Sequence, residues 1–138
     1  MLKILAIVIF LSSTFSLSDV KNKTNCFINL SVHDFNLKLN EEEVFLLDVR
    51  LLKDYRKERI ENAVCANNRD ILVYVTKKIT DDTPILVYCS DGNRSRIAAK
   101  ILCEELHFKN VFNLKYGIAQ WKKYGYDLDK SHIKRNKN

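Results

Sequence analysis

The chain has 138 residues, of which 46% are hydrophobic and 29% charged, with only three glycines and one proline. This composition suits one folded domain and excludes a disordered, collagen-like or linker-rich chain. The formal net charge of +6 permits a nucleic-acid or anionic-membrane partner without establishing one. Four cysteines are too few for a disulfide scaffold.

The first 18 residues follow the order of a secretory signal peptide. Residues 1–3 include the positively charged Lys3, residues 4–11 are an unbroken apolar run, and residues 12–18 are rich in serine. Ser16 and Ser18 have the spacing of a signal-peptidase site, so we expect cleavage after Ser18 and export to the periplasm or the cell exterior. An uncleaved anchor or a buried strand is the alternative, but the apolar run is too short for a stable membrane anchor.

After a polar leader at residues 19–27, apolar runs alternate with segments of helical spacing. The runs predict strands at 28–30, 44–49, 63–66, 85–88 and 110–114. The spacing predicts helices at 32–39 (capped by Ser31), 51–58, 70–78, 95–106 and 118–124. This alternation indicates an α/β fold with a mainly parallel sheet of about five strands flanked by helices, spanning residues 28–128.

Residues 129–138 form a basic tail that we expect to fray. Four of its residues are basic and one is acidic, so much of the basic excess lies outside the predicted domain. We therefore expect no nucleic-acid partner.

The segment after the strand at 85–88 carries the most chemical information. It consists of Cys89, Ser90, Asp91, Gly92, Asn93, Arg94 and Ser95. Ligands of open α/β sheets collect at the carboxyl ends of strands, and a short loop leading into a helix directs several backbone N–H groups to one point. These dipoles favour a thiolate at Cys89. Gly92 permits a positive φ, and Arg94 offers a planar fork to an oxyanion. The alternative is that Cys89 is a small buried hydrophobe beside a structural turn.

With this loop, the chain resembles the rhodanese family over roughly residues 28–128. The loop matches the family pattern Cys-x-x-Gly-x-Arg, and Leu47-Asp48-Val49-Arg50 matches the end of an early strand. Further matches are Ala98-Ala99, Asn110-Val111, Leu114, Gly117, Trp121 and Gly125. The resemblance implies the rhodanese-like three-layer fold.

The resemblance also implies sulfur transfer. Cys89 would take the outer sulfur of thiosulfate or a similar anionic donor as a persulfide, and a thiol, cyanide or an acceptor protein would then remove it. Ser90, Asp91, Gly92, Asn93, Arg94 and Ser95 would bind the substrate, with the backbone N–H groups stabilising negative sulfur. Asp48 and Arg50 are expected to support the strand end rather than touch the substrate. The resemblance implies neither a metal nor an organic cofactor.

Two other functions stay open. A rhodanese-like domain can serve as a binding or sensing module with little turnover, although the intact Cys89 favours chemistry. An anion hydrolase or arsenate reductase would use the same cysteine, but the related phosphatases have one more residue between the cysteine and the arginine.

Several residues depart from the family pattern or lack an assigned role. Tyr116 replaces the first glycine of the closing pair, Asp91 is expected to point to solvent, and Arg59 is expected to be solvated. Cys26, Cys65 and Cys103 show no C-x-x-C spacing, so a zinc site is not expected, and a disulfide between two of them is left open. Cys103 is expected on the core face of its helix, and Cys65 is a candidate resolving thiol.

Overall fold

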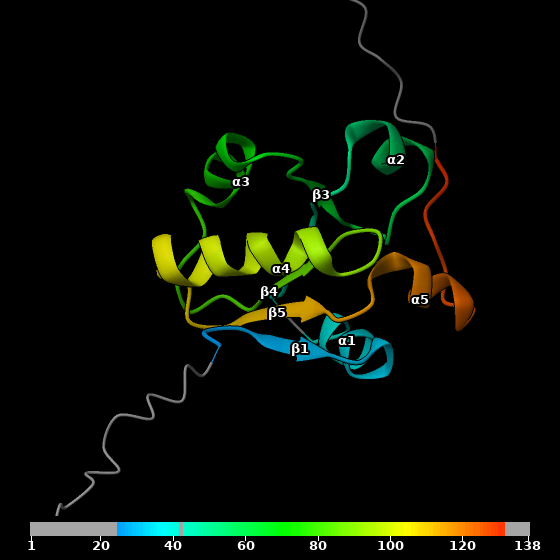
Figure 1. Cartoon of the computed structure of the whole chain (residues 1–138), viewed down its shortest axis with the longest axis horizontal. Coiled ribbons are helices and arrows are strands. Elements are labelled where there is room, and N and C mark those ends of the chain that lie inside the picture. Colours follow the sequence, from blue (N-terminus) through cyan, green and yellow to red (C-terminus); the bar gives the residue numbers. More distant parts are fainter. Residues whose placement is uncertain (1–24, 42, 132–138) are drawn as a thin grey trace, which may run out of the picture.

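The computed structural model describes residues 25–41 and 43–131. Its centre is a sheet of five parallel strands in the order β1-β5-β4-β2-β3. The strands are β1 (Ile28–Leu30), β2 (Phe45–Asp48), β3 (Val64–Cys65), β4 (Ile85–Tyr88) and β5 (Val111–Leu114). All five agree with the expected strands, and the α/β prediction is confirmed (Figure 1).

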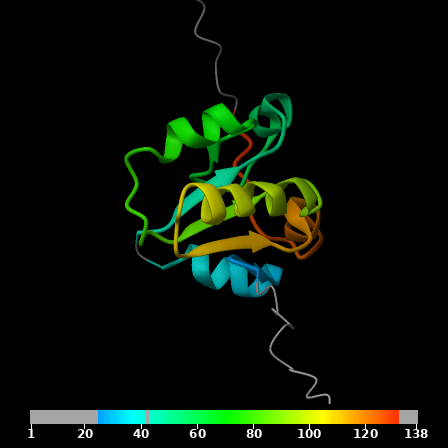
Figure 2. The same cartoon turned by 60° about the vertical axis from the view of Figure 1, so that its left-hand side comes forward.

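Helices cover both faces of the sheet (Figure 2). They are α1 (Val32–Leu39), α2 (Leu52–Lys57), α3 (Arg69–Thr76), α4 (Asn93–Lys100) and α5 (Gly117–Lys123). Residues of α3 and α4 pack on one face with Leu47, Val87 and Cys89, whereas residues of α1 and α5 pack on the other with Leu46 and Tyr88. Because successive strand residues point to opposite faces, Cys89 faces the layer of α3 and α4.

The helix after the cysteine loop differs from its expected form. Helix α4 begins at Asn93, two residues earlier than predicted, and Gly92, in the left-handed conformation, is its N-cap residue. The helix then passes into the π-helical segment η2 (Ile101–Glu105) instead of continuing to residue 106 as α-helix. The N–H of Leu106 donates to the carbonyl of Ile101 (3.0 Å), which is the five-residue step of a π-helix.

The structured unit extends beyond both boundaries expected from the sequence. Phe27, assigned to the leader, is buried in the core. Asp129, assigned to the fraying tail, pairs in a β-bridge and an ion pair with Arg59. Arg59 is only 6% exposed, so the expectation of a solvated side chain was wrong. The signal-peptide prediction, most of the leader, and the tail from residue 132 lie outside the described residues.

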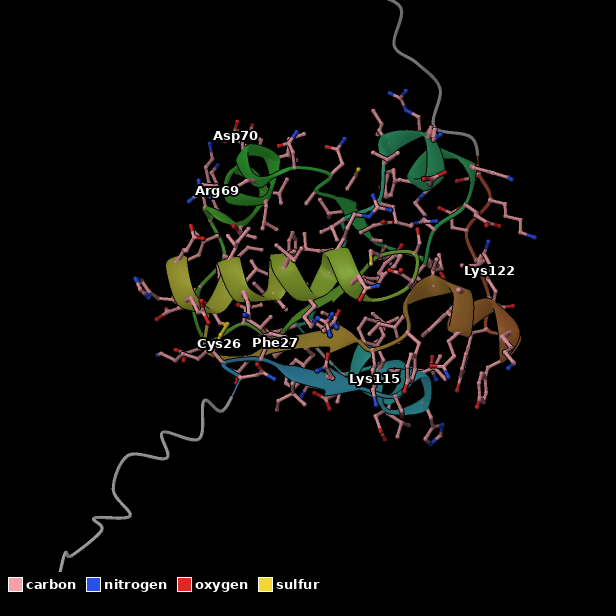
Figure 3. The ribbon with its side chains drawn as sticks, viewed as in Figure 1. Cys26, Phe27, Arg69, Asp70, Lys115 and Lys122 are labelled. Atoms are coloured by element: carbon pink, nitrogen blue, oxygen red, sulfur yellow. A yellow bond between two sulfur atoms is a disulfide. The ribbon has the colours of Figure 1, made fainter. Side chains whose placement is uncertain are left out.

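Cys26 and Cys103 form a disulfide that joins the residues before β1 to η2. Figure 3 shows Cys26 and Phe27 beside the end of the long helical ribbon that α4 and η2 form together. Cys103 packs against the core, as expected, but it is only half-buried and is bonded to Cys26. Cys65 and Cys89 are the free cysteines of the described residues.

Among the helices of the described residues, none has the length and apolar character needed to cross a bilayer.

Candidate functional site

The cysteine loop lies at the carboxyl edge of the sheet, between β4 and α4. The sulfur of Cys89 accepts a hydrogen bond from the backbone N–H of Gly92 (3.2 Å) and another from the hydroxyl of Ser95 (3.3 Å). Cys89 and Ser95 are both 0% exposed. The loop therefore directs two donors to a buried sulfur, an arrangement that stabilises negative charge on it.

Gly92 makes the tight turn of this loop. Its φ is 92°, in the left-handed region that glycine tolerates and side chains resist. A Cβ at this position would lie 2.1 Å from the carbonyl oxygen of Lys115. The turn therefore needs glycine both for its conformation and for its contact with the end of β5.

The first turn of helix α5 fixes the loop through hydrogen bonds. The N–H groups of Ile118 and Ala119 donate to the carbonyls of Cys89 (2.9 Å) and Ser90 (3.1 Å). A Cβ on Gly117, which has a φ of 63°, would lie 2.4 Å from the carbonyl carbon and oxygen of Ser90. With these carbonyls held by α5, the loop directs the N–H of Gly92 to the sulfur.

This positioning role of Gly117 was not predicted from the sequence, in which the residue was only a match to the family pattern. A glycine at a strand-to-helix turn was the available signal. The approach of α5 to the loop depends on the tertiary fold, and the spacing of residues in the sequence does not predict it.

Asp91 adds a negative charge to the same loop. Its side chain is exposed, as expected, yet its Oδ1 lies 3.6 Å from the sulfur of Cys89, so it does not simply point away into solvent. The backbone N–H and the side-chain amide of Asn93 bond to the carboxylate at 3.0 and 2.9 Å. These bonds lower the pKa of Asp91, and they fix its carboxylate beside the sulfur.

Arg94 is exposed, and its Nη2 lies 3.4 Å from the hydroxyl oxygen of Ser90. No ion pair of the described residues involves Arg94. Its guanidinium is therefore available to an anion that approaches the loop.

Asp48 and Arg50 form a buried ion pair after strand β2. The Arg50 Nε and Nη2 bond to the Asp48 carboxylate at 2.6 to 3.0 Å, and Nη2 also donates to the carbonyl of Glu58 at 2.6 Å. In the part of the chain that the structure describes, neither side chain bonds to the cysteine loop. The pair thus joins the end of β2 to the end of α2.

Cys65 lies too far away to form a disulfide with Cys89 in this conformation. Asp48 of β2 pairs with Cys65 of β3 on one side and with Tyr88 of β4 on the other. Two strand spacings therefore separate the Cα atoms of Cys65 and Tyr88 by about 10 Å, and Cys89 lies one residue further along. A disulfide needs Cα atoms less than about 7 Å apart. Burial, followed by the charge of Asp48, raises the pKa of the Cys65 thiol, which also makes it a poor attacking group. Both observations weigh against Cys65 as a resolving thiol.

Within residues 25–41 and 43–131, no cluster of three or more histidine, cysteine, aspartate or glutamate side chains could hold a metal ion.

The fold and the loop are those of a rhodanese-like domain. The family profile described as "Rhodanese-like domain" matches residues 31–124, and the chain belongs to this family.

Among curated proteins, the chain is 32% identical over 84 residues to the thiosulfate sulfurtransferase GlpE of Coxiella burnetii, covering 61% of this chain and 77% of that protein. It is also 32% identical over 106 residues to the tRNA uridine(34) hydroxylase of Pelagibacter ubique, covering 75% of this chain but 34% of that protein. The relatives therefore support sulfur transfer in general terms, and the family also occurs within proteins of another named activity.

Among solved structures, the rhodanese-like domain of an Anabaena protein superposes with a TM-score of 0.66 at 23% identity, covering 80% of this chain and 84% of that one. At this identity the likeness concerns the fold.

Proposed function

We propose that the protein is a sulfurtransferase that carries sulfane sulfur as a persulfide on Cys89. The observation that carries this proposal is the hydrogen bonding around the sulfur of Cys89. A buried sulfur at the end of β4 accepts hydrogen bonds from Gly92 N–H and Ser95 Oγ–H, at the start of α4.

In the first half-reaction, the Cys89 thiolate attacks the outer sulfur of thiosulfate. A new S–S bond forms at Cys89, the S–S bond of thiosulfate breaks, and its electron pair leaves with sulfite. The hydrogen bonds to the sulfur stabilise the thiolate before attack, and they stabilise it again as the leaving group when an acceptor removes the outer sulfur.

Donor binding requires a local rearrangement at Asp91. Its carboxylate lies against the buried sulfur and repels an anionic donor. Because Asp91 is exposed, its side chain can turn away when thiosulfate arrives, and Arg94 is free to pair with the donor oxygens. The balance between these two charges sets the affinity for anionic donors.

In the second half-reaction, a thiolate or cyanide attacks the outer sulfur of the Cys89 persulfide. The acceptor gains the sulfur and the Cys89 thiolate is restored, so the cycle needs no external oxidant or reductant. A protein thiol is a further candidate acceptor because the loop lies at the carboxyl edge of the sheet.

Export is part of this proposal. The signal-like sequence of residues 1–18 supports it. The disulfide between Cys26 and Cys103 supports it too, because disulfides persist in oxidising compartments such as the periplasm or the cell exterior.

The second candidate is a binding or sensing module with little turnover. The position of the Asp91 carboxylate favours it, since a negative charge 3.6 Å from the sulfur opposes thiosulfate binding. Measuring sulfite release from thiosulfate in the presence of cyanide or a thiol separates the two functions. Sustained release that Cys89→Ser abolishes and Cys65→Ser retains supports the enzyme, whereas no release with any acceptor supports the module.

A further inference from the structure

The cysteine loop has two exposed charged side chains, Asp91 and Arg94, and they are placed differently with respect to the sulfur of Cys89. The Asp91 Oδ1 lies 3.6 Å from this sulfur. The Arg94 guanidinium is bonded to the hydroxyl of Ser90, and among the described residues no hydrogen bond joins it to the sulfur. The loop charge that contacts the reactive atom is therefore negative.

The Asp91 carboxylate is available to a ligand that carries a positive charge. None of the ion pairs among the described residues includes Asp91. The backbone N–H and the side-chain amide of Asn93 bond to the carboxylate at 3.0 and 2.9 Å, which fixes its position without neutralising its charge. Because Asp91 is exposed, a cation can reach it from solvent.

This fixed charge acts on the second half-reaction. A thiol attacks the outer sulfur of the Cys89 persulfide as a thiolate, so every thiol acceptor brings a negative charge to the loop. The carboxylate repels that charge and raises the barrier to attack. An acceptor avoids this repulsion when it carries a positive charge near its own sulfur. An aminothiol such as cysteamine does so, because its thiolate form is a zwitterion with no net charge.

We propose that Asp91 selects the sulfur acceptor, and that this acceptor is a small aminothiol whose ammonium group pairs with the Asp91 carboxylate. The proposal rests on the function proposed above and specifies its acceptor. The aminothiol loses its thiol proton to solvent, and its thiolate attacks the outer sulfur of the Cys89 hydropersulfide. A new S–S bond forms, the bond from the outer sulfur to Sγ breaks, and its electron pair stays with Cys89 as the thiolate. The product leaves as the aminothiol hydropersulfide, R–S–SH.

The same carboxylate has opposite effects on the two half-reactions. It repels thiosulfate, which is a dianion, and it attracts the ammonium group of the acceptor. Asp91→Asn removes the charge and keeps a side-chain oxygen that can accept from the N–H of Asn93. The substitution should therefore accelerate persulfide formation from thiosulfate and slow removal of the sulfur by an aminothiol. General damage to the loop would slow both steps.

The test measures how fast three thiols remove sulfur from a Cys89 persulfide that has been formed with polysulfide and freed of excess reagent. Besides the thiol, cysteamine carries a positive charge, 2-mercaptoethanol carries no charge and 3-mercaptopropionate carries a negative charge. For each thiol, the rate constant of Asp91→Asn is divided by that of the wild type, which removes the intrinsic reactivity of the thiol. The ratio for 2-mercaptoethanol is the neutral reference.

Relative to this reference, Asp91→Asn should lower the rate constant for cysteamine about threefold and raise that for 3-mercaptopropionate about threefold. This size is that of an ion pair exposed to solvent. Both effects should shrink as salt is added, because ions screen the interaction between the carboxylate and the acceptor.

Asp82 offers a matched control. It is exposed and pairs with Lys109 at the surface. It precedes β4 whereas the cysteine loop follows β4, so the two aspartates lie at opposite edges of the sheet. Asp82→Asn changes the net charge by the same amount as Asp91→Asn, and it should leave the rate constants for all three thiols unchanged.

The outcomes distinguish this inference from the function on which it rests. Equal ratios for the three thiols, or the same pattern in Asp82→Asn, would overturn the aminothiol proposal and leave sulfur transfer standing. If thiosulfate forms no persulfide but the polysulfide-treated protein shows the expected pattern, the thiosulfate half-reaction fails and the acceptor proposal stands. If neither reagent forms a persulfide on Cys89, the proposed function fails and the acceptor proposal fails with it.

Discussion

The carboxylate of Asp91 lies 3.6 Å from the sulfur of Cys89, within a loop whose other close contacts to that sulfur are hydrogen-bond donors. Asn93 fixes this carboxylate through two hydrogen bonds and lowers its pKa. The loop thus stabilises negative charge on the sulfur of Cys89. It also holds a carboxylate beside that sulfur, where it repels an anionic donor such as thiosulfate.

Asp91→Asn should therefore accelerate persulfide formation from thiosulfate by about two- to tenfold, the size expected for a nearby charge in a solvent-exposed setting. The gain should shrink as salt is added, because ions screen the repulsion between donor and carboxylate. Stopped-flow measurement of sulfite release at two ionic strengths checks both effects. An unchanged or slower rate for Asp91→Asn would show that the carboxylate does not oppose the donor.

Gly117→Ala should destabilise the protein by about 3 kcal/mol, because a Cβ there meets the backbone of Ser90 at 2.4 Å and also strains a φ of 63°. Gly125→Ala is the matched control, with a φ of 74° and no atom within 4 Å of its added Cβ. The control should cost only about 1 kcal/mol from backbone strain. Urea unfolding gives both values, and equal losses would contradict the close packing of α5 on the loop.

The ion pair between Arg59 and Asp129 should add a pH-dependent part to stability. Hydrogen bonds from Ser131 and the charge of Arg59 lower the pKa of Asp129 in the folded state. A lowered pKa stabilises the fold above the unfolded carboxyl pKa of about 3.9, and this contribution is lost as the pH falls through the folded value. The difference in unfolding free energy between the wild type and Asp129→Asn should therefore decrease below about pH 4. A difference that stays constant down to pH 2 would contradict the pairing.

The disulfide between Cys26 and Cys103 closes a sequence separation of 77 residues. Replacing both cysteines with serine should lower the free energy of unfolding by about 2–4 kcal/mol, because the unfolded chain regains the entropy that the crosslink removes. Urea unfolding with and without a reductant measures this effect. The reductant should lower the stability of the wild type and leave that of the double variant unchanged, and equal behaviour of the two would argue against the bond.

The features that the sequence predicts well are local ones. The strand at 85–88, the cysteine that follows it and the glycine of the loop lie within a few residues of one another. Their pattern therefore predicts the strand–loop–helix geometry. The same holds for the cap of α1, where Ser31 accepts from the N–H of Asp34 as the residue type predicts.

The features that escape prediction depend on residues far apart in the chain. Arg59 is buried because Asp129, 70 residues later, pairs with it. Cys103 bonds to Cys26 because the fold brings η2 beside the start of β1. The placement of Asp91 against the sulfur depends on the side chain of Asn93, and nothing in the spacing of the loop specifies that rotamer.

The most direct test of the central claim is the mass of the intact protein after incubation with thiosulfate and removal of excess reagent. We predict a gain of one sulfur atom that maps to the peptide containing Cys89, disappears on addition of a thiol or cyanide, and is absent from Cys89→Ser. A wild-type mass that stays unchanged after exposure to thiosulfate, organic thiosulfonates and polysulfides, with Cys89 present as the free thiol, would contradict the account.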